Sequence, residues 1–264
     1  MERYQRAKGK KSLLGSHQKC WIWGRNLVLE TLRAGRWSIA ELHVAEDLPA
    51  ESLEEIRAAA ECRRVPLVVE PSAALTDRSH TAEHQGFLAA MRPFPYVPPT
   101  EFLASVQSAP APLCVMLDQI QDPYNLGAII RSAEVFGLSA VILGTRAQVG
   151  VTSMVARSSA GAVSRVPVVR ADGLEEMAAA LAAEGVPLVG ASEKAVRTLA
   201  EYDFRGAACV VVGNEGRGIS SELAARCQTL LRIPQHGRIG SLNAAAAAAV
   251  FFYEAQRQRQ TRGR

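Results

Sequence analysis

The most constraining feature of the sequence is a series of short, continuous apolar runs in its second half. Leu113–Leu117, Ala140–Gly144 and Ala207–Val212 show no polar alternation. Such strands are buried on both faces, as happens when helices cover both sides of a parallel sheet. Segments with helical spacing separate the runs, and neighbouring parallel strands need crossover connections of this kind. We therefore predict an α/β fold with a parallel sheet and ligands at the carboxyl ends of its strands.

Further elements of this second domain, placed at 113–256, follow from the same patterns. Leu126, Ile129, Ile130, Ala133 and Phe136 follow helical spacing, with Asn125 as the expected N-cap and Gly137 as the expected terminator. The remaining predicted strands are Arg165–Val169, Val186–Ala191 and Thr229–Ile233, and the remaining predicted helices are Val151–Gly161, Gly173–Glu184, Ser220–Cys227 and Ala244–Tyr253.

The first part of the chain also alternates strand and helix patterns, which predicts a small α/β domain over 20–92. Strands are expected at Cys20–Trp23, Ala40–Ala45, Val65–Val69 and Gly86–Met91, and helices at Asn26–Ala34 and Glu51–Arg63. Six prolines between Pro93 and Pro112 indicate a semi-rigid linker and domain boundary at 93–112, with a short helix at Glu101–Val106.

Charge is unevenly distributed along the 264 residues. Segment 1–19 holds six lysines and arginines against one acidic residue, and 257–264 holds four arginines, so 20–256 carries −5 of a total of +4. Basic tails on an acidic body favour a polyanionic partner such as nucleic acid, although charged termini can also serve solubility alone.

The cysteines and histidines exclude several classes of site. Five cysteines lie far apart with no C-x-x-C pair, so we expect neither disulfides nor zinc, and a reducing cytoplasm. No apolar run reaches the roughly 20 residues that span a bilayer. His80, His84 and Gln85 do not match the spacing of a metal site, and exposed loop positions are the favoured interpretation.

A polar loop, Arg232–Asn243, runs from the last predicted strand into the last helix. Gly237 and Gly240 allow unusual backbone angles, Ser241 stands at the expected N-cap, and Asn243 lies in the expected first turn. A helix N-terminus presents unpaired backbone N–H groups and the positive end of the dipole. Taken alone, this loop predicts an anion site.

Arg131 and Gly127 lie on one side of the helix that follows the first strand of the second domain. At 100° per residue Arg131 lies about 140° from Leu126 and about 40° from Gly127. A guanidinium beside a glycine leaves room for a bulky anion. A surface arginine beside a packing glycine explains the pattern equally well.

Gly213–Gly218 follows a buried strand and contains three glycines, but it lacks the Gly-Lys-Ser/Thr of a phosphate-binding loop. Glu215 within it is unusual. Its carboxylate suits hydrogen bonds from a ligand or from Arg131, or it caps the following helix.

Three segments in order resemble the motifs of the SpoU family, the knotted SPOUT-superfamily RNA 2′-O-ribose methyltransferases. They are Asn125-Leu-Gly with Arg131-Ser-Ala, Gly213-Asn-Glu-Gly with Gly218, and Ile233-Pro with Gly237 and Ser241-Leu-Asn243. Trp23-Gly24 and His84-Gln85-Gly86 resemble the family's L30e-like substrate-binding domain. The resemblance extends to the subgroup that methylates a guanosine ribose in 23S ribosomal RNA, and it implies a deep trefoil knot in the C-terminal domain.

The resemblance also implies a site. S-adenosylmethionine would contact Gly213, Ile233 and Leu242, while Asn125, Arg131, Glu215, Ser241 and Asn243 would supply the catalytic groups. It further implies a homodimer and an RNA substrate, with no metal and no membrane association. Two other functions fit the same motifs: ribose methylation of transfer RNA, and RNA binding without catalysis.

Overall fold

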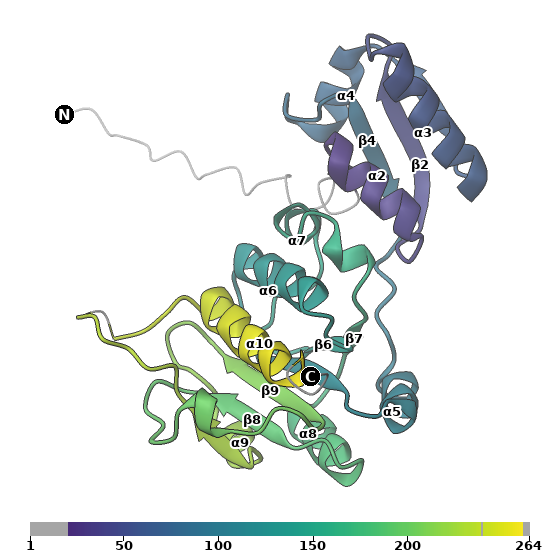
Figure 1. Ribbon diagram of the computed structural model, residues 1–264. Coiled ribbons are helices and arrows are strands. Elements are labelled where there is room, and N and C mark those ends of the chain that lie inside the picture. Colours follow the sequence, from purple (N-terminus) through teal and green to yellow (C-terminus); the bar gives the residue numbers. More distant parts are fainter. Residues whose placement is uncertain (1–20, 239, 261–264) are drawn as a thin grey trace, which may run out of the picture.

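The computed structural model describes residues 21–238 and 240–260, which form two α/β units, each built on its own sheet (Figure 1). The basic segment 1–19, Cys20, Arg262 and Arg264 lie outside the described residues. No helix in the described part of the chain is long and apolar enough to cross a membrane.

The first unit contains a mixed four-stranded sheet in the order β1-β4-β2-β3. Strand β2 is parallel to β3 and antiparallel to β4, and β1 is antiparallel to β4. Helix α4 was not predicted, because only Leu75 and Ser79 of its eight residues are buried. The elements are β1 (Trp21–Trp23), α2 (Arg25–Ala34), β2 (Ile39–Ala45), α3 (Ala50–Arg63), β3 (Leu67–Glu70), α4 (Ser72–Ser79) and β4 (Phe87–Met91).

The second unit contains a six-stranded sheet in the order β10-β8-β9-β5-β6-β7, and every pair in it is parallel. The predicted α/β fold with a parallel sheet is confirmed. Its strands are β5 (Leu113–Asp118), β6 (Ala140–Leu143), β7 (Val168–Arg170), β8 (Leu188–Ala191), β9 (Ala208–Gly213) and β10 (Thr229–Leu231). Its helices are α6 (Pro123–Val135), α7 (Ser153–Ser158), α8 (Leu174–Ala183), α9 (Ser221–Ala224) and α10 (Ala244–Gln260), with short 3₁₀ turns η1 (Ala162–Ser164) and η2 (Leu199–Glu201).

The apolar runs are buried on both faces, as predicted. Successive side chains of a strand point to opposite faces. Leu113 and Val115 of β5 belong to the same core as α6 and α10, while Cys114 and Met116 belong to the core that contains α8.

Two predicted helices are shorter than expected. Helix α7 ends before Ala160 and Gly161, both with positive φ, and α9 spans four residues.

The proline-rich segment is held against both units. Phe94 contacts Trp37 and Tyr96 edge to face, with ring centroids 5.1 and 4.9 Å apart. The Val97 N–H donates to Val168 O at 2.8 Å, so the segment extends the sheet beyond β7. Helix α5 (Pro99–Ser108) includes the predicted short helix. Proline stiffness is therefore supplemented by packing.

Two ion pairs join the units directly. Arg165 binds Glu30 at 2.6 Å, and Arg157 binds Glu83 at 3.0 Å. The Arg157 guanidinium also lies 4.7 Å from the centroid of the Trp23 ring, a cation–π geometry. The first unit is thereby fixed near α7 (Figure 1).

The expected basic tail at 257–264 is wrong for its first part, because α10 continues to Gln260. Arg259 donates to the carbonyl oxygens of Ala111 (3.0 Å), Phe204 (2.9 Å) and Gly206 (2.6 Å). These carbonyls need donors, and a guanidinium supplies several in a fixed fork.

Candidate active site

The glycine-rich loop after β9 is folded back on itself. The Asn214 N–H donates to Gly218 O at 3.0 Å, and the Gly218 N–H donates to Asn214 O at 2.9 Å. A Cβ at Gly213 would lie 2.1 Å from the Gly218 carbonyl carbon and 2.2 Å from Ile219 N. Only glycine fits at 213, because the loop backbone occupies the space of a side chain.

Asn214 fastens this loop to the loop after β5, a role that was not predicted. Its Oδ1 accepts from the N–H groups of Gly216 (3.0 Å) and Arg217 (3.2 Å), and its Nδ2 donates to Gln119 O at 2.9 Å. Asparagine commonly bonds the backbone two residues ahead in turns, so the sequence carried this signal.

Helix α6 begins earlier than predicted. Asp122 caps it by accepting from the Tyr124 N–H at 2.9 Å, and Pro123 occupies the first helical position, where its missing N–H costs nothing. The prediction that Asn125 is the cap is wrong. Asn125 lies in the first turn and is 8% exposed, so its amide faces the loops.

The second predicted cap is also wrong. Helix α10 begins at Ala244, and Asn243 Oδ1 accepts from the N–H groups of Ala245 (2.9 Å) and Ala246 (3.2 Å). Asn243 is therefore the cap, and Ser241 lies two residues before it. Serine and asparagine are both favoured N-caps, so residue type alone could not choose between them.

Three of the predicted site residues form one hydrogen-bonded chain. Asn243 Nδ2 donates to Asn125 Oδ1 at 2.9 Å, and Asn125 Nδ2 donates to Glu215 Oε1 at 2.7 Å. Glu215 Oε2 accepts from Asn214 at 3.3 Å. The carboxylate only accepts, so it fixes the orientation of the Asn125 amide. Among the described residues Glu215 neither pairs with Arg131 nor caps a helix.

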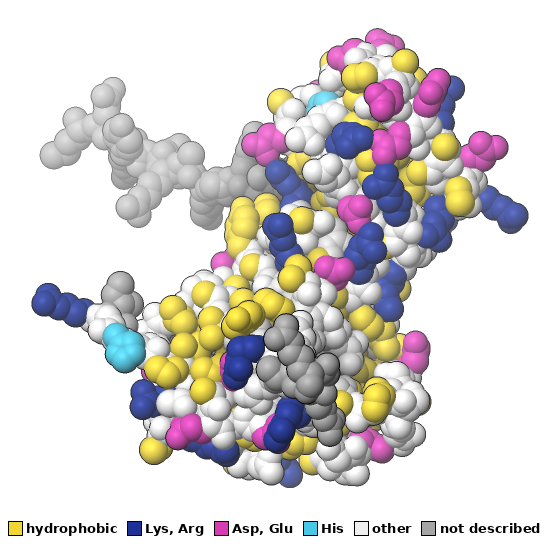
Figure 2. Space-filling view, in the orientation of Figure 1, with side chains coloured by type: hydrophobic (Ala, Val, Ile, Leu, Met, Phe, Trp, Pro, Cys, Tyr) yellow, Lys and Arg dark blue, Asp and Glu magenta, His cyan; other side chains and the backbone are white. Residues whose placement is uncertain are grey.

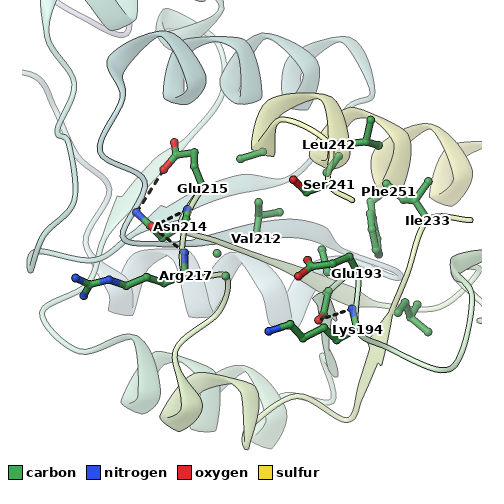
Figure 3. Close-up of a pocket in the computed structure, with 18 of the residues that line it drawn as sticks. Glu193, Lys194, Val212, Asn214, Glu215, Arg217, Ile233, Ser241, Leu242 and Phe251 are labelled. Atoms are coloured by element: carbon green, nitrogen blue, oxygen red, sulfur yellow. Dashed lines mark hydrogen bonds between the residues drawn. The ribbon is translucent and has the colours of Figure 1, made fainter. Parts of the chain in front are cut away.

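An open cavity of about 220 Å³ lies at the carboxyl ends of β8 and β9 (Figure 3). The three predicted cofactor residues Gly213, Ile233 and Leu242 line it, as do Ser241 and Glu215. Further lining residues that were not predicted are Ser192, Glu193, Lys194, Val212 and Phe251. The hydrogen-bonded chain therefore meets the cavity at Glu215.

Arg131 lies on the exposed side of α6 and does not line this cavity. The space beside Gly127, the glycine next to Arg131 on the helix, is occupied by protein. A Cβ at Gly127 would lie 1.8 Å from Ser158 Oγ of α7. Ser158 Oγ also donates to Pro123 O at 3.1 Å. The packing interpretation of Gly127 is confirmed, and the guanidinium itself faces solvent.

His84 departs from the prediction of an exposed loop residue, whereas His80 is exposed as expected. His84 is buried, Nδ1 accepts from the Gly86 N–H at 3.0 Å, and Nε2 lies 3.0 Å from Thr76 Oγ1. Burial lowers its pKa. It holds the turn before β4. No group of three or more metal-ligating side chains occurs within 21–238 and 240–260.

Comparison with known proteins assigns the family. Residues 112–253 match the SpoU rRNA Methylase family. The chain belongs to this family. Residues 21–97 match the domain described as RNA 2'-O ribose methyltransferase substrate binding. The predicted SpoU membership is thereby confirmed, and with it the class of RNA methyltransferase.

Relatives and solved structures agree with this SpoU assignment. An uncharacterized tRNA/rRNA methyltransferase of Mycolicibacterium smegmatis is 38% identical over 91% of this chain and 77% of its own. The AdoMet-bound rRNA methyltransferase of Sinorhizobium meliloti has a TM-score of 0.77 at 27% identity, covering 91% and 87% of the two chains. The SpoU methyltransferase AviRb of Streptomyces viridochromogenes with AdoMet gives 0.77 at 26%, covering 91% and 90%.

Proposed function

We propose that this SpoU methyltransferase transfers a methyl group from S-adenosylmethionine to a ribose 2′-hydroxyl in RNA, with a guanosine of 23S ribosomal RNA as the target. The observation that carries the proposal is the Asn243–Asn125–Glu215 chain, which meets the cavity at Glu215. The match of 21–97 to a 2'-O ribose substrate-binding domain supports the ribose as acceptor.

The cavity suits S-adenosylmethionine, which the two AdoMet-bound structural neighbours also hold. Val212, Ile233, Leu242 and Phe251 offer apolar walls for an adenosyl group, and the close-packed turn at Gly213 offers backbone polar groups at the edge of the cavity. We assign Gly213, Ile233 and Leu242 to cofactor binding. When bound, the sulfonium supplies an electrophilic methyl group.

The protein's own part is to orient the hydroxyl and to stabilise charge. Asn125 is buried and held on both sides, so Glu215 is presented to the cavity with little freedom. Glu215 and Ser241 both line the cavity and are suited to position a ribose hydroxyl there. An arginine side chain stays protonated at neutral pH and is a poor general base. Arg131 therefore serves to hold a neighbouring phosphate and to stabilise developing negative charge.

We propose that the two units have separate roles in the reaction. We assign 20–92 to RNA binding, 93–112 to a linker that fixes orientation, and 113–256 to methyl transfer. The loop between β8 and β9 bonds both the chain leaving β10 and the end of α10, through Leu199 to Arg232 and through Phe204 to Gln258 and Arg259. This enclosure supports a trefoil knot, with α10 as the threaded segment.

A homodimer is the expected assembly. Val135 of α6 and Tyr253 of α10 are 66% and 57% exposed, and they line a shared surface cavity with Phe136. Figure 2 shows hydrophobic side chains gathered over α10. Exposed apolar patches of this kind mark association sites. A dimeric mass in light scattering that falls to the monomer mass in Val135→Glu would support this interface.

The experiment for the activity uses methyl-labelled S-adenosylmethionine and total RNA from cells that lack the modification. Label in 23S ribosomal RNA is expected, and transfer to 16S or transfer RNA would redirect the substrate assignment. Cofactor binding measured by calorimetry without any transfer to RNA would instead indicate a non-catalytic RNA-binding protein. The activity is expected in the cytoplasm, in line with the widely spaced cysteines of the sequence.

A further inference from the structure

We propose that RNA docks on an arginine surface at the end of the first unit that adjoins the linker, made of Arg36, Arg63, Arg64 and Arg92. This inference rests on the proposed RNA substrate and adds the surface that receives it. All four side chains are exposed.

The overall charge of the first unit does not favour RNA. Residues 21–92 carry eight arginines, no lysine and eleven acidic residues, a net charge of −3. An RNA backbone approaches such a unit only where positive charge is concentrated and not already neutralised. The position of each arginine therefore matters more than the total.

Three of the eight arginines are neutralised by neighbouring carboxylates. Arg25 and Arg33 bind Glu55 at 2.5 and 2.6 Å, and Arg78 binds Glu70 at 3.0 Å. In the part of the chain that the structure describes, none of the four proposed arginines belongs to an ion pair with an acidic side chain.

The topology brings these four together. Arg36 follows α2, Arg63 and Arg64 end α3, and Arg92 follows β4. The Arg92 N–H donates to Ser38 O at 3.0 Å, and the Arg63 guanidinium packs against Gly35. The opposite end of the sheet, at the end of β2 and the start of α3, carries the exposed acidic residues 46, 47 and 51.

The unit is thus polarised. Figure 2 shows Asp and Glu side chains around its far end, and Lys and Arg side chains interspersed with a few acidic ones toward the second unit. At the linker itself, the exposed Arg170 of β7 lies 5.2 Å from the centroid of the Tyr96 ring. Arginine pairs with phosphate through a planar fork of donors, so several free guanidinium groups on one face suit an RNA backbone.

Only one of the four arginines of this surface has a structural role within the protein. Arg63 donates to the backbone carbonyl of Arg33 at the end of α2, where a cation also opposes the helix dipole. Arg36, Arg64 and Arg92 have no such contact among the described residues. They are therefore the positions to change.

The test compares two triple variants with equal change in charge, Arg36→Gln/Arg64→Gln/Arg92→Gln and Arg25→Gln/Arg33→Gln/Arg78→Gln. Filter binding of the full-length protein to unmodified transcribed 23S ribosomal RNA is measured at several salt concentrations. The first variant should lower the slope of log affinity against log salt by about 2–3, since each lost phosphate contact contributes about 0.7–0.9. The ion-paired control should lower it by less than about 1.

Calorimetry with S-adenosylmethionine separates this inference from the proposed function. Both triple variants should bind the cofactor like wild type, which also shows that the second unit is folded, and circular dichroism melts report the first unit. Equal salt slopes in the two folded variants would overturn the arginine surface while leaving the methyltransferase assignment intact. A wild type that binds the RNA but transfers no methyl group would overturn the proposed function instead.

Discussion

Asn125→Asp is the sharpest perturbation of the site, because it preserves volume and replaces one donor with an acceptor. Asn125 Nδ2 lies 2.7 Å from Glu215 Oε1, so the variant would place two carboxyl groups at hydrogen-bond distance. The hydrogen bond lost is one to a charged acceptor, worth about 1.5–3 kcal/mol. The hydrogen bond that Asn243 Nδ2 donates to the side chain at position 125 remains possible, because the substituted carboxylate keeps an acceptor oxygen there.

The loss of stability in Asn125→Asp should depend on pH. Two carboxylates this close cannot both ionise, so the folded-state pKa of the pair rises above the unfolded value of about 4. A raised folded pKa means that stability is intact at low pH and is lost as pH rises through that pKa. We expect a loss of about 2–3 kcal/mol at pH 7.5, or about 5–10 °C in melting temperature, and a much smaller loss near pH 4.5.

Thermal melts of wild type and Asn125→Asp at both pH values provide the assay. Glu215→Gln in the Asn125→Asp background is the matched rescue, because the new amide can donate to the new carboxylate. The double variant should recover at least half of the stability lost at pH 7.5. Equal melting temperatures for wild type and Asn125→Asp at pH 7.5 would show that the Asn125–Glu215 bond does not exist in solution.

Three other predictions test separate parts of the account. Arg131→Ala and Arg131→Lys should both abolish methyl transfer, since lysine lacks the two-pronged phosphate contact of arginine. Both variants should keep a calorimetric affinity for S-adenosylmethionine within about twofold of wild type. Wild-type turnover in either variant would refute the phosphate-holding role of Arg131. Gly213→Ala should weaken cofactor binding at least about tenfold, since its Cβ would lie 2.1 Å from the Gly218 backbone; unchanged affinity would mean that the loop opens freely. Because burial lowers the pKa of His84, its contribution to stability should be present above about pH 6.5 and decline below it. His84→Asn should therefore flatten the dependence of melting temperature on pH. An unchanged pH profile in this variant would show that His84 does not cause the dependence.

The sheet of the second unit was predictable from sequence because burial on both faces removes polar alternation. Leu113–Leu117 and Ala207–Val212 carry that signal directly, and they became the central strands β5 and β9. Element ends were less predictable. Helix α6 begins at Pro123 after the Asp122 cap, before the predicted cap at Asn125. Helix α4 was missed because its sequence is mostly polar and has one inward leucine.

The sequence suggested a set of candidate site residues but could not give their arrangement. Asn125, Glu215 and Asn243 are separated by 90 and 28 positions, and only the fold shows that their side chains bond in series. Local pattern assigned capping to Asn125, whereas tertiary contacts hold it between two loops. The opposite error occurred at Asn243, whose position beside Ser241 hid its role as the cap.

The measurement that tests the central claim most directly is nucleoside mass spectrometry of unmodified 23S ribosomal RNA after incubation with the protein and S-adenosylmethionine. A ribose 2′-O-methyl group protects the adjacent phosphodiester from alkali, because the attacking hydroxyl is blocked. We expect one alkali-resistant dinucleotide containing 2′-O-methylguanosine, formed by wild type and absent with Arg131→Ala. Methylation on a base, with the backbone fully alkali-sensitive, would contradict it.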